Sequence, residues 1–288
     1  MELRELLAQP QHLPTIPALV QSLIASLAEE DVSLAAIARQ ISADPVLSAK
    51  LLRLANSAYF RTARPIGSVD DALKLLGAKM VRNLVIGSGL TAACKVAPGL
   101  DIQQFWRYSL GTACAARWLA GEARQNGELA FMVGLMHGIG QFAMRAGMPR
   151  EMSRLDAETH PLDARRAMLE QQALGFDHAE AGAELARQWR FPEPIAHGIG
   201  SVPAPLDAKP KSPTAGLVHL AAWRARGAAL GDGAKKLVAS YPEPVAASLG
   251  IAKGWMPMLA AKGEESGPSM RPMPELSELT AGLDAMLE

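Results

Sequence analysis

The sequence lacks most of the features that would directly identify an enzyme class or a cellular compartment. Cysteine is scarce: Cys94 and Cys114 lie in apolar stretches without the spacing of metal ligands, and we interpret them as small buried residues in a reducing compartment. Net charge is absent, because 29 basic residues balance 29 acidic ones. Bulk charge therefore gives no indication of nucleic acid, acidic lipid or a polyanionic substrate.

A long hydrophobic run is also absent. The longest weakly polar run, residues 84–94, is far shorter than the ~18 residues that a membrane-spanning helix needs. The start of the chain carries charges of both signs and does not have the layout of a signal peptide. We therefore expect a cytoplasmic protein with no membrane contact, long enough at 288 residues for one large domain or two medium ones.

Helical periodicity, by contrast, is abundant. Apolar side chains recur at intervals of three and four residues, which predicts amphipathic helices. Asp44 and Ser68 stand where N-terminal caps are expected, and Gly77 where a helix ends. The predicted helices cover residues 16–27, 34–41, 45–54, 68–77, 78–86, 102–120, 128–145, 161–174, 178–189, 214–226 and 242–249. No alternating strand pattern is present, so the predicted fold class is all-α.

Several motifs, in this order along the chain, are typical of one family. They are Leu13–Pro17, Ile41–Leu47, Leu54–Phe60, Ala72–Gly77, Trp106–Ser109, Gly134–Gly140 and Gly175–Glu180. Over about residues 13–225 the chain strongly resembles the HDOD family, the HD-related output domain of bacterial signal-transduction proteins. The most specific part is Asp44-Pro45 followed by Asn56–Phe60.

The resemblance implies an N-terminal helical bundle packed on a degenerate HD-type helical core. We expect the HDOD domain at 13–225, divided into the bundle at 13–100 and the core at 101–225. The remaining expected segments are an N-terminal lead-in at 1–12, a C-terminal helical extension at 226–261, a flexible linker at 262–274 and a short amphipathic helix at 275–288. Prolines in 201–214 predict an exposed loop.

The resemblance also shows which residues of this sequence stand at the metal-ligand positions of HD proteins. In HD phosphohydrolases a His-Asp pair and further His and Asp residues hold one or two ions. Here His137 and His178 remain, but two of about six ligands do not complete a zinc site, which needs at least three. The other positions, including a basic one after the His-Asp motif, hold Tyr108, Gly138, Gln141, Val202 with Pro203, and Ala222. Rescue by His197, His219 or Asp177 would need a new geometry. We expect no catalytic residue, no metal and no cofactor.

The simplest interpretation of His137 is a buried histidine hydrogen-bonded to a carbonyl. Gly138 is spaced by four from Gly134, and Gly134 by four from Ala130, which predicts a small-residue stripe in a packed core rather than a cavity.

Two stretches are candidate interaction surfaces. Asn56, Ser57, Tyr59 and Phe60 end a helix, where they either complete the helix terminus or form a contact surface. Residues 45–95 are rich in Lys and Arg, and Lys79 and Arg82 lie on the second helix of an arrangement similar to a helix-turn-helix. That helix is too apolar to present several side chains to bases, which favours a solvated face or an acidic protein partner.

The sequence therefore predicts a non-enzymatic signal-transduction module that binds a signalling protein, with a small ligand in the vacated metal site as a further input. The alternative is a metal-dependent phosphohydrolase of a nucleotide or cyclic dinucleotide, centred on His137 and His178. A second alternative is nucleic-acid binding through residues 45–95.

Overall fold

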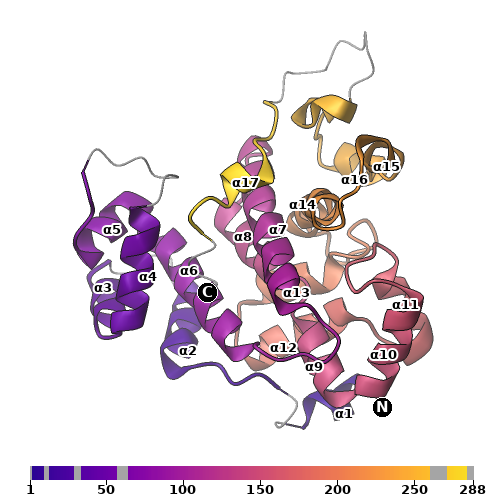
Figure 1. Cartoon of the computed structure of the whole chain (residues 1–288), viewed down its shortest axis with the longest axis horizontal. Coiled ribbons are helices and arrows are strands. Elements are labelled where there is room, and N and C mark those ends of the chain that lie inside the picture. The colour runs from indigo at the N-terminus through magenta and orange to yellow at the C-terminus, as the bar shows by residue number, and fades with distance from the viewer. Residues whose placement is uncertain (1, 10–12, 29–33, 57–63, 260–270, 284–288) are drawn as a thin grey trace.

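The structure is a computed structural model that describes residues 2–9, 13–28, 34–56, 64–259 and 271–283 (Figure 1). Within these ranges helices are present and strands are not, so the all-α prediction is confirmed. None of the helices in these ranges combines the length and the apolar character needed to cross a lipid bilayer.

The N-terminal bundle consists of α2 to α6, which lie together on one side of Figure 1. Its helices are α2 (Ala18–Ala25), α3 (Leu34–Ser42), α4 (Pro45–Ala55), α5 (Val69–Leu76) and α6 (Ala78–Ala93). The Asp44 carboxylate accepts from the amides of Val46 and Leu47 at 2.9 and 3.1 Å, so it caps α4 as predicted. Ser68 caps α5 in the same way, and Gly77, with φ of +81°, joins α5 to α6.

The HD-type core is built on α7 (Ile102–Glu122), which packs against α8 (Gly127–Met136) and α14 (Pro213–Ala229). Beside them lie α9 (Gly140–Gly147), α12 (His178–Gln188) and α13 (Glu193–Ser201). The helix α1 (Leu3–Leu7) packs on α9 and α12 rather than on the bundle, through the buried side chain of Leu6. α10 (Pro149–Glu158) and α11 (Arg166–Leu174) complete this side of the molecule (Figure 1).

The predicted helix at 128–145 is wrong as a single element. Residues 137–139 form a turn that separates α8 from α9. Gly134 does bring two helices close, because a Cβ there would lie 2.8 Å from the Cα of Ala113 on α7. Gly138 instead lies in the turn, where a Cβ would meet the ring of Phe105 at 2.9 Å. The stripe is therefore divided, and Gly138 packs beyond the end of the helix.

Other differences concern short or polar helices. α10, α13 and α15 (Ala234–Ala239) were not predicted, α11 begins later than residue 161, and α16 is Glu243–Ser248. The 201–214 segment is not wholly exposed, because Val202 is buried.

The C-terminal segment returns to the body of the protein. α17 (Leu276–Leu279), yellow in Figure 1, packs on α7. Arg224 on α14 donates to the Glu275 carboxylate at 3.0 Å, and Leu283 is buried. Most of the predicted linker at 262–274 lies outside the described residues.

Candidate functional site

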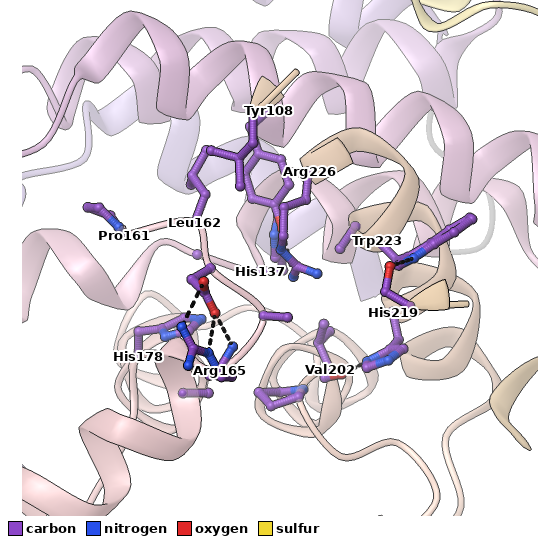
Figure 2. Close-up of a pocket in the computed structure, with 18 of the residues that line it drawn as sticks. Tyr108, His137, Pro161, Leu162, Arg165, His178, Val202, His219, Trp223 and Arg226 are labelled. Atoms are coloured by element: carbon purple, nitrogen blue, oxygen red, sulfur yellow. Dashed lines mark hydrogen bonds and ion pairs between the residues drawn. The ribbon is translucent and has the colours of Figure 1, made fainter. Parts of the chain in front are cut away.

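A pocket of about 330 Å³ lies where α7, the α8–α9 turn, α12 and α14 meet (Figure 2). The positions that the resemblance assigns to metal ligands and their neighbours all line it: Tyr108, His137, Gly138, Gln141, His178, Val202, Pro203 and Ala222. The fold therefore brings these positions together. A cavity is present here, contrary to the expectation of a fully packed core around Gly138.

His137 ends α8 and is buried, with 4% of its surface exposed. Its Nδ1 lies 2.7 Å from the carbonyl oxygen of Gly134, so this nitrogen carries the proton and donates. Burial lowers the pKa of His137 to about 3, which leaves the ring neutral. The ring meets the edge of Tyr108, with centroids 5.0 Å apart.

His178 begins α12 and is fixed by a buried carboxylate. Oε2 of Glu170 lies 2.6 Å from the ring Nδ1 and 2.8 Å from the backbone nitrogen of the same histidine. Burial alone would lower the pKa of His178, but the negative charge of Glu170, the hydrogen bond to it and the charge of Asp177 together outweigh burial and raise that pKa. Burial would raise the pKa of Glu170, but the positive charge of His178 and hydrogen bonds from both neighbours lower it to about 2. Each partner therefore favours the charged form of the other.

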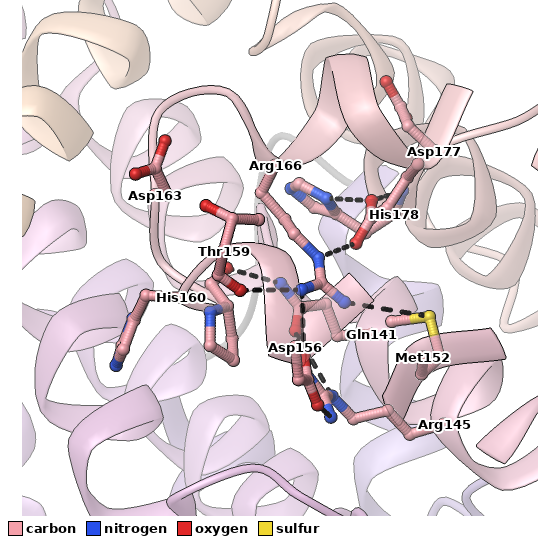
Figure 3. A network of polar contacts seen from close by, with 12 residues as sticks. Gln141, Arg145, Met152, Asp156, Thr159, His160, Asp163, Arg166, Asp177 and His178 are labelled. Carbon is pink, nitrogen blue, oxygen red and sulfur yellow. Dashed lines mark hydrogen bonds and ion pairs between the residues drawn. The ribbon is translucent and has the colours of Figure 1, made fainter. Parts of the chain in front are cut away.

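Glu170 also belongs to a chain of buried ion pairs (Figure 3). Nε of Arg166 donates to Oε1 of Glu170 at 2.8 Å, and Nη1 of Arg166 donates to Asp156 at 2.8 Å. Asp156 in turn receives two hydrogen bonds from Arg145, at 2.7 and 2.8 Å. The side chains of Arg145, Arg166 and Glu170 are at most 1% exposed. This network fixes α9, α10 and α11 to α12, and through His178 to the pocket.

The donors in the pocket do not fit a catalytic metal. Among the described residues, no three His, Cys, Asp or Glu side chains are arranged to hold an ion. His178 binds Glu170 through Nδ1, and His219 donates from Nδ1 to the carbonyl of Val202 at 2.8 Å, so either ring could ligate an ion only through Nε2. A guanidinium, that of Arg226, also lines the pocket and would repel a cation.

The candidate surface at the end of α4 is described only at Asn56. Its side-chain nitrogen donates to the carbonyl of Ile66 at 2.8 Å, and its oxygen accepts from the amide of Ile66 at 2.7 Å. Asn56 therefore ties the end of α4 to the start of the next segment, which is the terminus role considered above. Ser57, Tyr59 and Phe60 lie outside the described residues.

The candidate basic surface divides between two different environments. Lys79 is exposed on α6. Arg82 is buried, and its Nη1 donates to the carbonyl of Ser26 at 2.7 Å, so its charge is not presented to a partner. Residues 80–90 of α6 are all buried, and this helix has no free face to lay in a groove of DNA.

Two residues of the site were missed at the sequence level. Glu170, the partner of His178, and Arg226 were not singled out. Glu170 follows Arg166 by four residues and Arg226 follows Ala222 by four, so each shares a helix face with its neighbour, but this spacing does not show that the face is buried.

The all-helical fold and this reduced ligand set define a degenerate HD-type protein. The model of the HDOD domain family matches residues 13–205. The chain belongs to the HDOD family.

Individual relatives agree with this assignment. A phosphohydrolase candidate from Shewanella amazonensis SB2B has a similar structure, with a TM-score of 0.71 and 27% identity, covering 98% of this chain and 96% of that one. An HDOD domain protein of unknown function from Geobacter sulfurreducens shares the fold, with a TM-score of 0.67 and 23% identity over 86% of this chain and 95% of that one.

An uncharacterized protein of Treponema pallidum (strain Nichols) is 27% identical over 191 residues. The match covers 65% of this chain but only 37% of that protein, so the chain spans about a third of the length of this relative.

Proposed function

We propose that this chain is a non-catalytic regulatory module that acts by binding a signalling protein, with the degenerate HD pocket open to a small ligand. The observation that carries the proposal is the chemistry of the pocket. The carboxylate positions beside His137 and on α14 are Gly138 and Ala222, and the remaining lining includes the cation Arg226. A site that binds a divalent ion needs carboxylates or additional imidazoles there.

The hydrogen bonds and ion pairs behind the pocket also support a binding role. Both carboxylate oxygens of Glu170 are hydrogen-bonded, one to Arg166 and the other to His178, and the ion-pair network behind Glu170 is buried. These contacts keep the pocket in shape without contributing a group that could activate water. Its volume, about 330 Å³, is at the lower end of the range for small-molecule pockets.

A hydrolysis assay tests the non-catalytic part. The full chain, supplied with Mn²⁺, is incubated with bis(p-nitrophenyl) phosphate and with a cyclic dinucleotide, beside the variant His137→Ala. We expect equal background rates for both proteins. Turnover that is lost in His137→Ala would instead favour the alternative of a metal-dependent phosphohydrolase. The observation that favours this alternative is the structural similarity to the Shewanella phosphohydrolase candidate.

An affinity capture from the native cell tests the binding part. The full chain serves as bait beside the variant Tyr59→Ala, which changes the candidate surface after α4, and Val96→Ala, which changes a residue that is 81% exposed. We expect a partner that the wild type and Val96→Ala retain and that Tyr59→Ala loses. Failure of all three baits to enrich any protein would contradict the proposal.

A further inference from the structure

The pocket at the degenerate HD site contains a positive charge that no described carboxylate neutralises. Two of the lining cations are paired: Arg165 binds Asp163 at 3.1 Å, and Lys236 binds Asp232 at 2.6 Å. Arg226 has no ion-pair partner in the part of the chain that the structure describes. An unneutralised guanidinium attracts an anion more strongly inside a partly enclosed pocket than in open water, since the local dielectric is lower.

The donors of Arg226 are also incompletely used. Its Nε is buried and has no hydrogen-bond partner among the described residues. Its Nη2 lies 3.5 Å from the hydroxyl oxygen of Tyr108, a long contact. Figure 2 shows the guanidinium beside the ring of His137, at the centre of the pocket. A buried donor without an acceptor costs free energy, so an acceptor that enters the pocket gains by binding it.

Arg226 shares a helix face with Ala222, a position that the HD resemblance assigns to a metal ligand. Ala222, one turn earlier on α14, also lines the pocket and is 2% exposed. Side chains four residues apart share one face of a helix, so a carboxylate at position 222 would pair with Arg226. With alanine there, the positive charge stays available to a ligand.

Two histidines in the pocket indicate which hydrogen-bonding groups the ligand carries besides its anion. Nδ1 of His137 and Nδ1 of His219 each donate to a backbone carbonyl, those of Gly134 and Val202. Burial lowers the pKa of both rings, so each keeps an unprotonated Nε2 that can only accept. The pocket therefore offers donors at Arg226 and acceptors at two imidazoles.

We propose that this pocket binds a small organic oxyanion, a carboxylate or a phosphate, which Arg226 holds and whose hydroxyl or amino groups donate to His137 and His219. The inference rests on the proposed function, since a pocket without a catalytic ion leaves this space to a ligand. The volume of about 330 Å³ suits a metabolite-sized molecule.

Nitrogen–proton NMR of the arginine side chains tests the inference on the full chain. The Nε–H signal of Arg226 is identified by its absence in Arg226→Gln. Inorganic phosphate and succinate are titrated separately at constant ionic strength, and calorimetry gives the affinity. We expect a saturable shift of the Arg226 signal with at least one probe. The affinity should fall about tenfold or more in Arg226→Gln, as for the loss of a charged hydrogen bond.

Two further variants make the test specific. Ala222→Asp keeps Arg226 but places a carboxylate one turn away, and it should weaken binding by a similar factor. If Arg226→Gln does not fold, the affinity of Ala222→Asp is the test. Arg224→Gln lies on the same helix but pairs with Glu275 outside the pocket, and it should bind like the wild type. Saturation by phosphate alone assigns a phosphate ligand, and by succinate alone a carboxylate.

The inference is overturned if neither probe shifts the Arg226 signal saturably, or if Arg226→Gln and Ala222→Asp both bind with unchanged affinity. Such a result would leave the non-catalytic function standing. That function fails separately, through hydrolysis that depends on His137.

Discussion

Glu170 holds His178 at two points, accepting from the ring Nδ1 at 2.6 Å and from the backbone N–H at 2.8 Å. The carboxylate is completely buried, and Arg166 holds it from the other side at 2.8 Å. The histidine that the HD resemblance marks as a metal ligand is therefore part of a structural ion network in this chain.

The network predicts the pH dependence of His178. Its folded pKa is raised above 6.5, so the charged pair stabilises the protein fully below about pH 6.5 and loses this contribution as the pH rises through the folded pKa. The stability difference between the wild type and His178→Gln should be larger at pH 6 than at pH 9. Chemical denaturation at the two pH values measures it, and an equal difference at both would contradict the charged pair.

His137 should behave in the opposite sense. Its folded pKa of about 3 lies below the unfolded value, so unfolding takes up a proton as the pH falls below 6.5. The stability that depends on the neutral ring is present above about pH 6.5 and is lost progressively toward pH 3. His137→Asn can keep the hydrogen bond to Gly134 without titrating. The wild type should therefore lose stability more steeply than His137→Asn between pH 7 and pH 4, and parallel curves would show that His137 is not held neutral.

Removal of Asp156 should be costly, because it is shared by two buried arginines. Asp156→Asn leaves Arg145 and Arg166 short of one negative charge, and loss of one partner from a buried pair costs about 3–5 kcal/mol. Asp163→Asn is the matched control: its pair with Arg165 is partly exposed, and it should cost at most about 1 kcal/mol. Urea denaturation of both variants checks this, and similar small losses would mean that the network contributes little.

Gly140 should not tolerate a side chain. A Cβ there would overlap the carbonyl oxygen of His178 and lie 2.5 Å from the amide nitrogen of Gly182, so α9 and α12 would have to separate. Gly140→Ala should destabilise the fold by about 1–3 kcal/mol, the usual cost of overpacking. Gly121→Ala on α7 meets nothing within 4 Å and should be neutral or slightly stabilising. Thermal unfolding distinguishes the two variants, and equal melting temperatures would contradict the close approach.

Local signals in the sequence predicted the fold where short-range chemistry decides it. The caps at Asp44 and Ser68 and the end at Gly77 could be read directly, because capping depends on neighbouring residues. The break after Met136 was missed, although Gly138 and Gly140 stand there and the apolar run continues across it. α10 was missed because most of its residues are polar, with only Met152 and Leu155 buried.

The sequence predicted which residues replace the expected metal ligands, but not which other residues form the site. The motifs placed Tyr108, Gly138 and Ala222 at positions that the resemblance assigns to ligands, and all three line one pocket. The burial of Arg166 and Glu170 was hidden, since a pair four residues apart has the same pattern in a solvated helix. Arg226 was hidden for a similar reason: only the fold shows that its helix face points into the pocket.

The metal content of the purified full chain tests the central claim most directly. The chain and the variant His137→Ala are incubated with Mn²⁺, Fe²⁺ or Zn²⁺ and dialysed. Inductively coupled plasma mass spectrometry then gives the number of ions bound per chain. We predict far less than one ion per chain, with no difference between the two proteins. One or more tightly held ions per chain, lost in His137→Ala, would contradict the account.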